Sequence, residues 1–154
     1  MFPKQMIERI RFELEQIDDF LAAYEELLDE CRFKEPDLIK LTAVASVLHS
    51  FYNGVENILL QVARNIDESV PEGNQWHRDL LIQASTAMST RIPILSPQSR
   101  EFLADYMAFR HFYRHSYSFC LKWNELEKLV RQLPHVWPMV KGEIKTFLDG
   151  KHYS

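Results

Sequence analysis

Apolar residues recur at intervals of three and four positions along most of this 154-residue chain. The first such stretch covers 5–31, and its apolar positions are Ile7, Ile10, Leu14, Ile17, Leu21, Tyr24, Leu28 and Cys31. Because an α-helix turns once in about 3.6 residues, this spacing places them on one face of a helix. Alternation of apolar and polar residues, which would indicate β-strands, is absent, and the chain contains only four glycines. The sequence therefore predicts an all-α fold.

Four more segments follow the helical pattern. The expected helices cover 37–66, 76–88, 97–117 and 125–148. Pro134 and Pro138 should break or kink the last of them, because proline removes a backbone donor and clashes with the preceding turn. Loops of a few to ten residues join the helices, which is typical of an up-and-down antiparallel bundle of four to five helices. The length suits a single helical-bundle domain over 1–154 with a substantial core.

Single residues mark two helix starts and one helix crossing. Pro36 suits the first turn of the second helix, and Ser96 followed by Pro97 predicts an N-cap and a first helical residue. Gly54 lies within the second helix, where glycine is less favourable than alanine. We therefore expect another helix to approach the backbone closely at Gly54.

The composition excludes two classes of protein. Apolar residues make up 46% and aromatic residues 12% of the chain, which excludes a disordered protein. The net charge of −4 excludes a generally basic nucleic-acid coat, so any nucleic-acid contact must be local and sensitive to salt. The outer face of the first helix is acidic, through Glu13, Glu15, Asp18, Asp19, Glu25 and Glu26. This face is either solvated or a docking surface for a basic partner.

The cysteines and the absence of targeting signals indicate the compartment. Cys31 and Cys120 each lie in a helical apolar pattern, without the CxxC or Cys/His spacing of a metal site. We interpret them as two buried thiols in a reducing cytoplasm. The sequence shows no signal peptide, lipidation motif or long apolar run, so we expect a soluble cytoplasmic protein that does not contact membranes.

A cationic stretch, 109–117, combines two arginines, two histidines and two tyrosines within nine residues. Arginine grips phosphate, histidine moves protons near neutral pH, and tyrosine presents a hydroxyl group. On a helix, one side collects Phe102, Tyr106, Phe109, Phe112, Tyr113 and Ser116, which we expect to face the core. The other side collects Arg110, His111, Arg114 and His115, preceded by Leu103 and Met107.

Arg110 and His115 are five residues apart, about 140° around a helix, so they do not face each other within one regular helix. They can converge if the helix ends near His115, or if a second copy of the chain faces the first across a two-fold axis. Leu103 and Met107, apolar and expected to lie away from the core, favour the second arrangement, because they resemble the edge of a symmetric dimer contact.

Polar residues near Gly54 and the start of the third helix each have two interpretations. His49, Asn53, Glu56 and Asn57 form either ordinary surface and a buried hydrogen-bond network, or they supply a carboxylate or amide that orients the arginine and histidine cluster. Trp76, followed by His77 and Arg78, either stacks on a nucleic-acid base or anchors the helix by packing.

The pattern Arg110, four residues, His115, one residue, Tyr117 resembles the Rx4HxY motif of the HEPN superfamily, and specifically its HepT-like ribonuclease toxins. The run 51–57 and the loop-to-helix junction from Pro71 to Trp76 and His77 are similar too, so the likeness covers most of the chain. At the second motif position this chain has His111, where many relatives carry Asn or Asp, and this leaves the role of that position open.

The resemblance implies a metal-independent endoribonuclease whose site forms at a homodimer cleft. RNA supplies its own nucleophile, the 2′-hydroxyl group. Arg110 would then clamp the phosphate, and His115 would act as the general acid or base. His111 and Arg114 would position RNA, with Glu56 and Asn57 as supporting residues.

The resemblance also implies regulation by a partner in a type VII-like HEPN/MNT toxin–antitoxin pair. In HepT-like systems the tyrosine equivalent to Tyr117 accepts AMP groups from an MNT-type nucleotidyltransferase antitoxin. Such AMPylation would place negative phosphates beside Arg110 and repel RNA. The chain itself would need no cofactor, since ATP and Mg²⁺ are used by the antitoxin.

Two alternatives to the ribonuclease remain open. A non-catalytic HEPN-like module would bind a nucleotide or a partner without cleaving RNA. A helical adaptor would use the acidic face of the first helix, including Glu25 and Glu26. His111 and His115 have the spacing of two metal ligands on a helix, but no acidic residue accompanies them and arginines flank them, so we expect no metal site.

Overall fold

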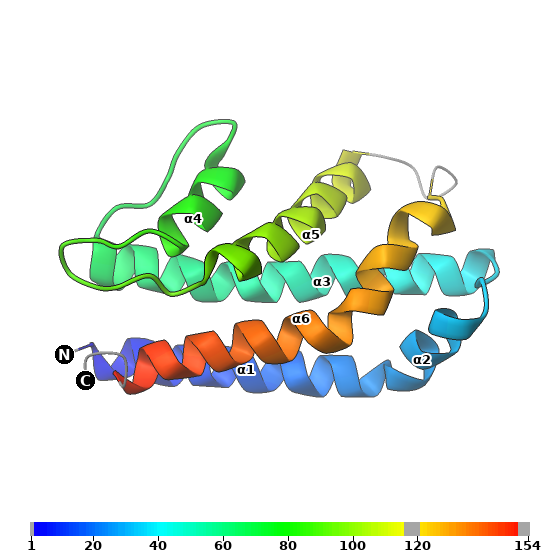
Figure 1. Ribbon diagram of the computed structural model, residues 1–154, viewed down its shortest axis with the longest axis horizontal. Coiled ribbons are helices and arrows are strands. Elements are labelled where there is room, and N and C mark those ends of the chain that lie inside the picture. Colours follow the sequence, from blue (N-terminus) through cyan, green and yellow to red (C-terminus); the bar gives the residue numbers. More distant parts are fainter. Residues whose placement is uncertain (1, 116–120, 151–154) are drawn as a thin grey trace.

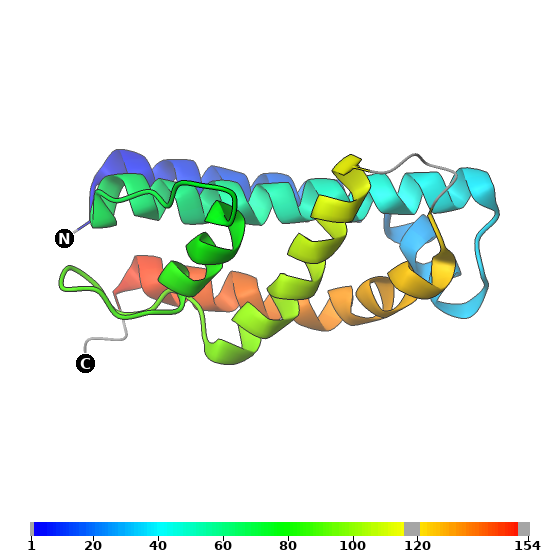
Figure 2. The same ribbon diagram turned by 90° about the horizontal axis from the view of Figure 1, so that it is seen from above.

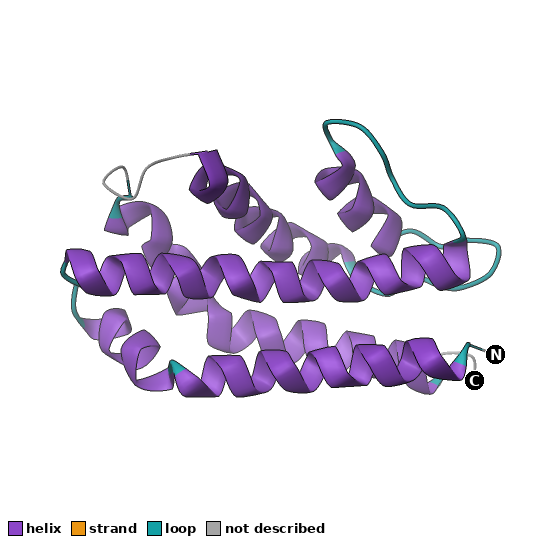
Figure 3. Ribbon diagram, turned by 180° about the vertical axis from the view of Figure 1, so that it is seen from behind, coloured by secondary structure: helices purple, strands orange, loops and turns teal. Residues whose placement is uncertain are grey.

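The computed structural model describes residues 2–115 and 121–150. In these residues it contains six α-helices, one short π-helical turn and no strand (Figure 3). In chain order the elements are α1 (Lys4–Ala23), α2 (Glu25–Phe33), α3 (Leu38–Val62), η1 (Ala63–Asp67), α4 (Trp76–Ala84), α5 (Pro97–His115) and α6 (Trp123–Asp149). The predicted all-α fold is confirmed.

Helix α3 is the central element, and it contacts each of the other five α-helices. Helices α1 and α5 run in one direction along the molecule, whereas α3 and α6 run in the opposite direction (Figure 1). This is the up-and-down antiparallel arrangement that the sequence predicts. Helix α5 crosses α3 obliquely, and the short α4 lies beside the first half of α5 (Figure 2). Helices α4 and α5 therefore lie against α3 and against each other.

The first predicted helix is divided into two. Helix α1 ends at Ala23, and the backbone N–H of Tyr24 bonds back to the carbonyl of Leu21 over 3.2 Å. The residues around this break, 22–26, are exposed, so no core contact holds the chain in one continuous helix. After the break, α2 packs against α6.

Two other helix boundaries differ from the prediction, and the last helix is bent but not broken. The N-cap of α3 is Asp37, whose carboxylate accepts a bond from the N–H of Lys40 over 2.9 Å, so Pro36 precedes the helix instead of entering its first turn. Helix α4 stops at Ala84, where the Ser85 hydroxyl bonds to carbonyl oxygens of the last turn. Helix α6 is continuous through Pro134 and Pro138, although its first turns run at a clear angle to the rest (Figure 1).

The core face of α5 corrects one expectation. The buried residues of this helix are Ser99, Leu103, Tyr106 and Phe109. Leu103 is 0% exposed, so the prediction that it lies away from the core was wrong. Met107 is partly buried and packs against the core as well. The apolar face is wider than expected because α5 contacts α4 and α6 in addition to α3.

Gly54 lies where α1 crosses α3, as the sequence predicts. A Cβ atom at Gly54 would lie 2.8 Å from Cγ1 of the buried Ile17 side chain. This distance is shorter than carbon atoms tolerate, so glycine permits the close approach of the two helices.

Two polar contacts fix the start of α5. The Ser96 hydroxyl accepts a bond from the N–H of Ser99 over 3.1 Å, which confirms Ser96 as the N-cap. The preceding loop is attached to η1 by Arg91, whose guanidinium bonds both carboxylate oxygens of Asp67, and both side chains are buried.

The acidic face of α1 is not wholly solvated. Asp18 accepts a hydrogen bond from Nε1 of Trp137 over 2.7 Å and pairs with Lys141, so it connects α1 to α6. Cys31 is buried as expected, whereas Cys120 lies outside the described residues. None of the described helices is both long enough and apolar enough to cross a membrane.

Candidate functional site

A connected group of polar side chains lies where α3, α4 and α5 meet. We call it the Arg110 network; its members are His49, Asn53 and Glu56 from α3, His77 from α4 and Arg110 from α5. The three α3 residues are four and three positions apart, so they share one face of that helix. The network therefore depends on the packing of three helices that are distant in sequence.

Arg110 is held by an amide and an imidazole. Its Nε donates to Oδ1 of Asn53 over 2.5 Å, and its Nη1 lies 3.5 Å from Nε2 of His77. Within the described part of the chain, no carboxylate pairs with Arg110 and no acceptor bonds its Nη2. The guanidinium thus keeps its positive charge and one free edge, which is what binding of a phosphate requires.

Behind Arg110, His77 is paired with a buried carboxylate. Nδ1 of His77 lies 2.7 Å from Oε2 of Glu56, which is only 4% exposed. The Trp76 ring lies against the His77 ring, tilted by 30°, with centroids 3.6 Å apart. The carboxylate accepts from Nδ1–H, so the lone pair of the neutral ring lies on Nε2 and points towards Arg110.

His49 closes the other end of the network. Its Nε2 accepts a hydrogen bond from the Asn53 amide over 3.1 Å, and its ring lies against that of Tyr113 with centroids 4.8 Å apart. Burial lowers the pKa of His49, and the charges of Arg110 and Arg114 lower it further. His49 is therefore neutral near pH 7, as its acceptor role towards Asn53 requires.

Tyr52 lies on the same helix as Glu56 and is completely buried. Burial raises the pKa of its hydroxyl well above the ordinary value, and the charge of Glu56 adds to this effect. The phenol stays protonated at any physiological pH, so it cannot act as a base at the site.

The other predicted residues on α5 lie in its last turn. His111, Arg114 and His115 are exposed, and the rings of His111 and His115 pack with centroids 4.6 Å apart. Arg110 faces α3 and α4 instead, and no hydrogen bond of the described residues joins it to His115. This separation agrees with the angle expected from their spacing. Tyr117 lies outside the described residues.

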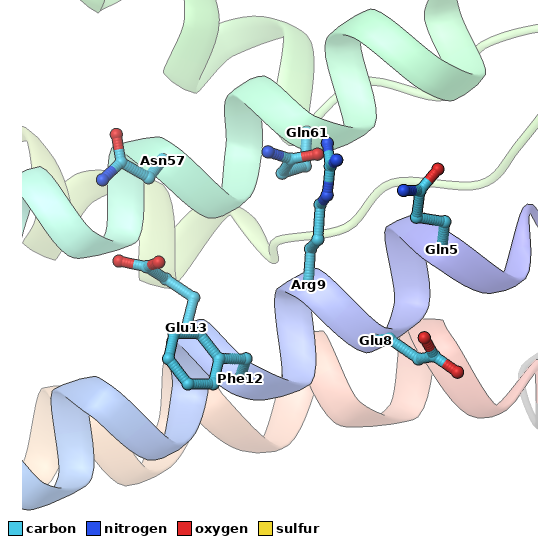
Figure 4. Close-up of a pocket in the computed structure, with 7 residues that line it drawn as sticks. All are labelled: Gln5, Glu8, Arg9, Phe12, Glu13, Asn57 and Gln61. Carbon is cyan, nitrogen blue, oxygen red and sulfur yellow. The ribbon is translucent and has the colours of Figure 1, made fainter.

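The two supporting residues predicted on α3 are placed differently. Glu56 belongs to the Arg110 network, whereas Asn57 is exposed and lines a separate pocket between α1 and α3 (Figure 4). That pocket is lined by Gln5, Glu8, Arg9, Phe12, Glu13, Asn57 and Gln61. Sequence reasoning did not identify His77 as a partner of Arg110, because nothing in the local pattern shows which helix α4 packs against.

A comparison with known protein families shows which family the chain belongs to. A family model described as HepT-like protein matches residues 43–150, which is more than half of the sequence. The chain belongs to the HepT-like family. No curated protein and no solved structure matches it significantly.

The HepT-like match includes every member of the Arg110 network. Proteins of this family are HEPN-type and generally ribonuclease toxins, and HEPN proteins typically dimerise and pair with antitoxins. In this HepT-like chain, the described residues contain no group of three or more His, Cys, Asp or Glu side chains able to hold a metal ion. The Arg110 network supplies guanidinium, imidazole, amide and carboxylate groups from α3, α4 and α5.

Proposed function

We propose that this chain is a metal-independent endoribonuclease toxin in which Arg110 and His115 cleave RNA at a homodimer cleft. One observation carries the proposal: in a HepT-like chain, the arginine of the Rx4HxY motif is oriented by an amide and an imidazole, pairs with no carboxylate of the described residues and keeps a free edge. An arginine that only stabilised the fold would more often be paired with a carboxylate, as Arg91 is with Asp67.

The proposed chemistry follows from what RNA supplies. The 2′-hydroxyl attacks the adjacent phosphorus, and negative charge grows on the phosphate oxygens. The Arg110 guanidinium stabilises this charge, and His115 transfers a proton. Because Arg110 and His115 lie on different sides of α5, we infer that one copy supplies the arginine and the other supplies the histidine. His111 and Arg114 position the RNA from the exposed last turn of α5.

Regulation is part of the proposal. We infer that an MNT-type nucleotidyltransferase antitoxin transfers AMP from ATP, with Mg²⁺, to the hydroxyl of Tyr117, and that pyrophosphate and the hydroxyl proton are released. The added phosphates would lie two residues from His115 and repel the RNA backbone. The chain itself needs no cofactor for cleavage in this scheme.

The test is cleavage of RNA by the purified protein with EDTA present. We expect activity to survive EDTA and to fall by about 10²–10³-fold in Arg110→Ala and in His115→Ala, as for removal of a charge-stabilising group or an acid–base group. Arg131→Ala, which removes an exposed arginine of α6, is the matched control and should retain activity. Wild-type rates in His115→Ala would show that the assignment is wrong.

A non-catalytic HEPN-like module is the second candidate. It is favoured by the exposed position of His115, which contacts His111 instead of Arg110 in one copy of the chain. Such a module would bind a nucleotide or the partner enzyme through Arg110 without turnover. Expression in a bacterial host separates the candidates, since growth arrest that is relieved by Arg110→Ala or His115→Ala supports the ribonuclease.

A further inference from the structure

We propose that His77, backed by Glu56, is the general base of the site and accepts the proton of the RNA 2′-hydroxyl group. This inference rests on the proposed ribonuclease function and adds a catalytic residue that lies outside the Rx4HxY motif. It assigns the base to the same copy of the chain as Arg110.

The first support is the environment of the imidazole. On one side, Nδ1 of His77 lies 2.7 Å from the buried carboxylate of Glu56, while the side chain as a whole remains 25% exposed. A buried carboxylate behind a partly open histidine fixes the ring and its tautomer and stabilises the imidazolium that forms when a proton is taken up. A histidine that served only packing would not need a buried charge behind it, because burying a carboxylate is costly.

The second support is the position of His77 beside Arg110. Nε2 of His77 lies 3.5 Å from Nη1 of Arg110, a distance longer than most hydrogen bonds. In RNA the 2′-hydroxyl and the scissile phosphate belong to the same nucleotide, so their catalytic partners must be neighbours. A phosphate bound at the free edge of Arg110 brings its 2′-hydroxyl towards Nε2 of His77.

The proposed step is a transesterification at the scissile phosphate. Nε2 of His77 takes the proton of the 2′-hydroxyl while the 2′-oxygen bonds to phosphorus and the bond from phosphorus to the 5′-oxygen breaks. The leaving 5′-oxygen takes a proton from protonated His115. The products are a 2′,3′-cyclic phosphate and a 5′-hydroxyl end, with His77 protonated and His115 neutral.

The charged groups that face His77 are compatible with this role. Glu56 of α3 stabilises the imidazolium, and Arg110 of α5 opposes it. A phosphate bound at Arg110 places a negative charge beside that guanidinium, so the positive charge that faces His77 is offset when RNA is present. His49 contacts Asn53 and not His77.

The alternative is that His77 only holds Arg110 in place. Asn53 offers the matched comparison, since it also orients Arg110 but cannot exchange protons near neutral pH. Loss of orientation alone should weaken binding of the phosphate, whereas loss of the base should slow the chemical step.

The experiment measures kcat and KM for an oligoribonucleotide between pH 5 and 8, with EDTA, in wild type, His77→Ala, His77→Gln and Asn53→Ala. We expect both His77 variants to lose about 10²-fold or more in kcat, with little change in KM. In wild type, kcat should rise with pH as the base loses its proton, and in both His77 variants this rise should be absent. Added imidazole should restore part of the activity of His77→Ala. Asn53→Ala should mainly raise KM and keep the pH dependence. The amide of His77→Gln can still donate a hydrogen bond to Glu56, so this variant tests the inference if His77→Ala fails to fold.

Two results would overturn the inference. The first is a His77 variant that retains the kcat of wild type. The second is that both His77 variants match Asn53→Ala in KM and in pH profile, which is the behaviour of a positioning residue. If wild type cleaves and only the Arg110 and His115 variants are inactive, this inference fails while the proposed function stands. If wild type cleaves no RNA, the proposed function itself fails.

Discussion

At the scale of single residues, the structure holds Arg110 by an amide and an imidazole. The Asn53 amide bridges two groups, accepting from Nε of Arg110 and donating to Nε2 of His49. This bridge requires a neutral His49, because a protonated imidazole has no lone pair to accept the Asn53 N–H. The charge state of one histidine therefore bears on the orientation of the arginine.

We predict that His49 titrates below the ordinary histidine pKa of 6.5. Burial favours the neutral ring, and the charges of Arg110 and Arg114 add to this effect. As the pH falls below about 6.5, the unfolded chain gains a proton that folded His49 does not bind, so the free energy of unfolding decreases there. NMR titration of the histidine ring protons measures the pKa directly.

Arg110→Gln should raise the pKa of His49 towards its ordinary value, because it removes a nearby positive charge. Arg64→Gln, which removes an exposed arginine beyond the end of α3, should leave the His49 pKa unchanged. A wild-type pKa at or above 6.5, or no response to Arg110→Gln, would contradict the prediction.

The sequence predicted part of this residue-level picture. The polar residues near Gly54 were candidates for an amide or carboxylate partner of the arginine, and Asn53 and Glu56 are in the Arg110 network. Asn57 follows Glu56 directly, so it points about 100° away and reaches a different surface. The contact between His77 and Arg110 joins residues 33 positions apart, and it depends on how α4 packs, which no local pattern contains.

At the scale of the elements, the close crossing of α1 and α3 depends on the absence of a side chain at Gly54. We predict that Gly54→Ala destabilises the fold by about 1–2 kcal/mol, because the strain of overpacking exceeds the gain in helix propensity. The new Cβ would meet Cγ1 and Cδ1 of Ile17 at 2.8 and 2.9 Å. Chemical denaturation gives the change in the free energy of unfolding.

Gly142→Ala is the control, since a Cβ at Gly142 in α6 would meet nothing within 4 Å. That variant should gain up to about 1 kcal/mol from helix propensity alone. Combining Gly54→Ala with Ile17→Ala should cost less than the sum of the two single changes, because Ile17→Ala removes both clashing atoms. Strict additivity, or a stable Gly54→Ala variant, would refute the close crossing.

Helix positions were predictable because burial repeats with the helical period, and the starts at Ser96 and Pro97 follow from capping chemistry. Two features were not predictable in this way. The break at Tyr24 falls among exposed residues, and the apolar spacing continues across it, so the sequence pattern does not mark it. The burial of Leu103 reflects the number of helices that surround α5, which widens its apolar face.

At the scale of the whole molecule, one copy of the chain does not bring the motif residues together. Arg110 faces α3 and α4, whereas His115 is exposed in the last turn of α5. The expected dimer contact through Leu103 is not available, since that side chain is in the core. The proposed homodimer therefore rests on the separation of Arg110 from His115 and on the tendency of HEPN proteins to dimerise.

The central claim is that Arg110 of one copy and His115 of another act on the same phosphodiester. Co-expression of differently tagged Arg110→Ala and His115→Ala chains, followed by purification through both tags, isolates the mixed dimer. One of its two sites would be intact, so we predict about half of the wild-type rate of RNA cleavage with EDTA present. A doubly tagged Arg110→Ala dimer, the control, should be inactive. A mixed dimer that is as inactive as this control would contradict the claim.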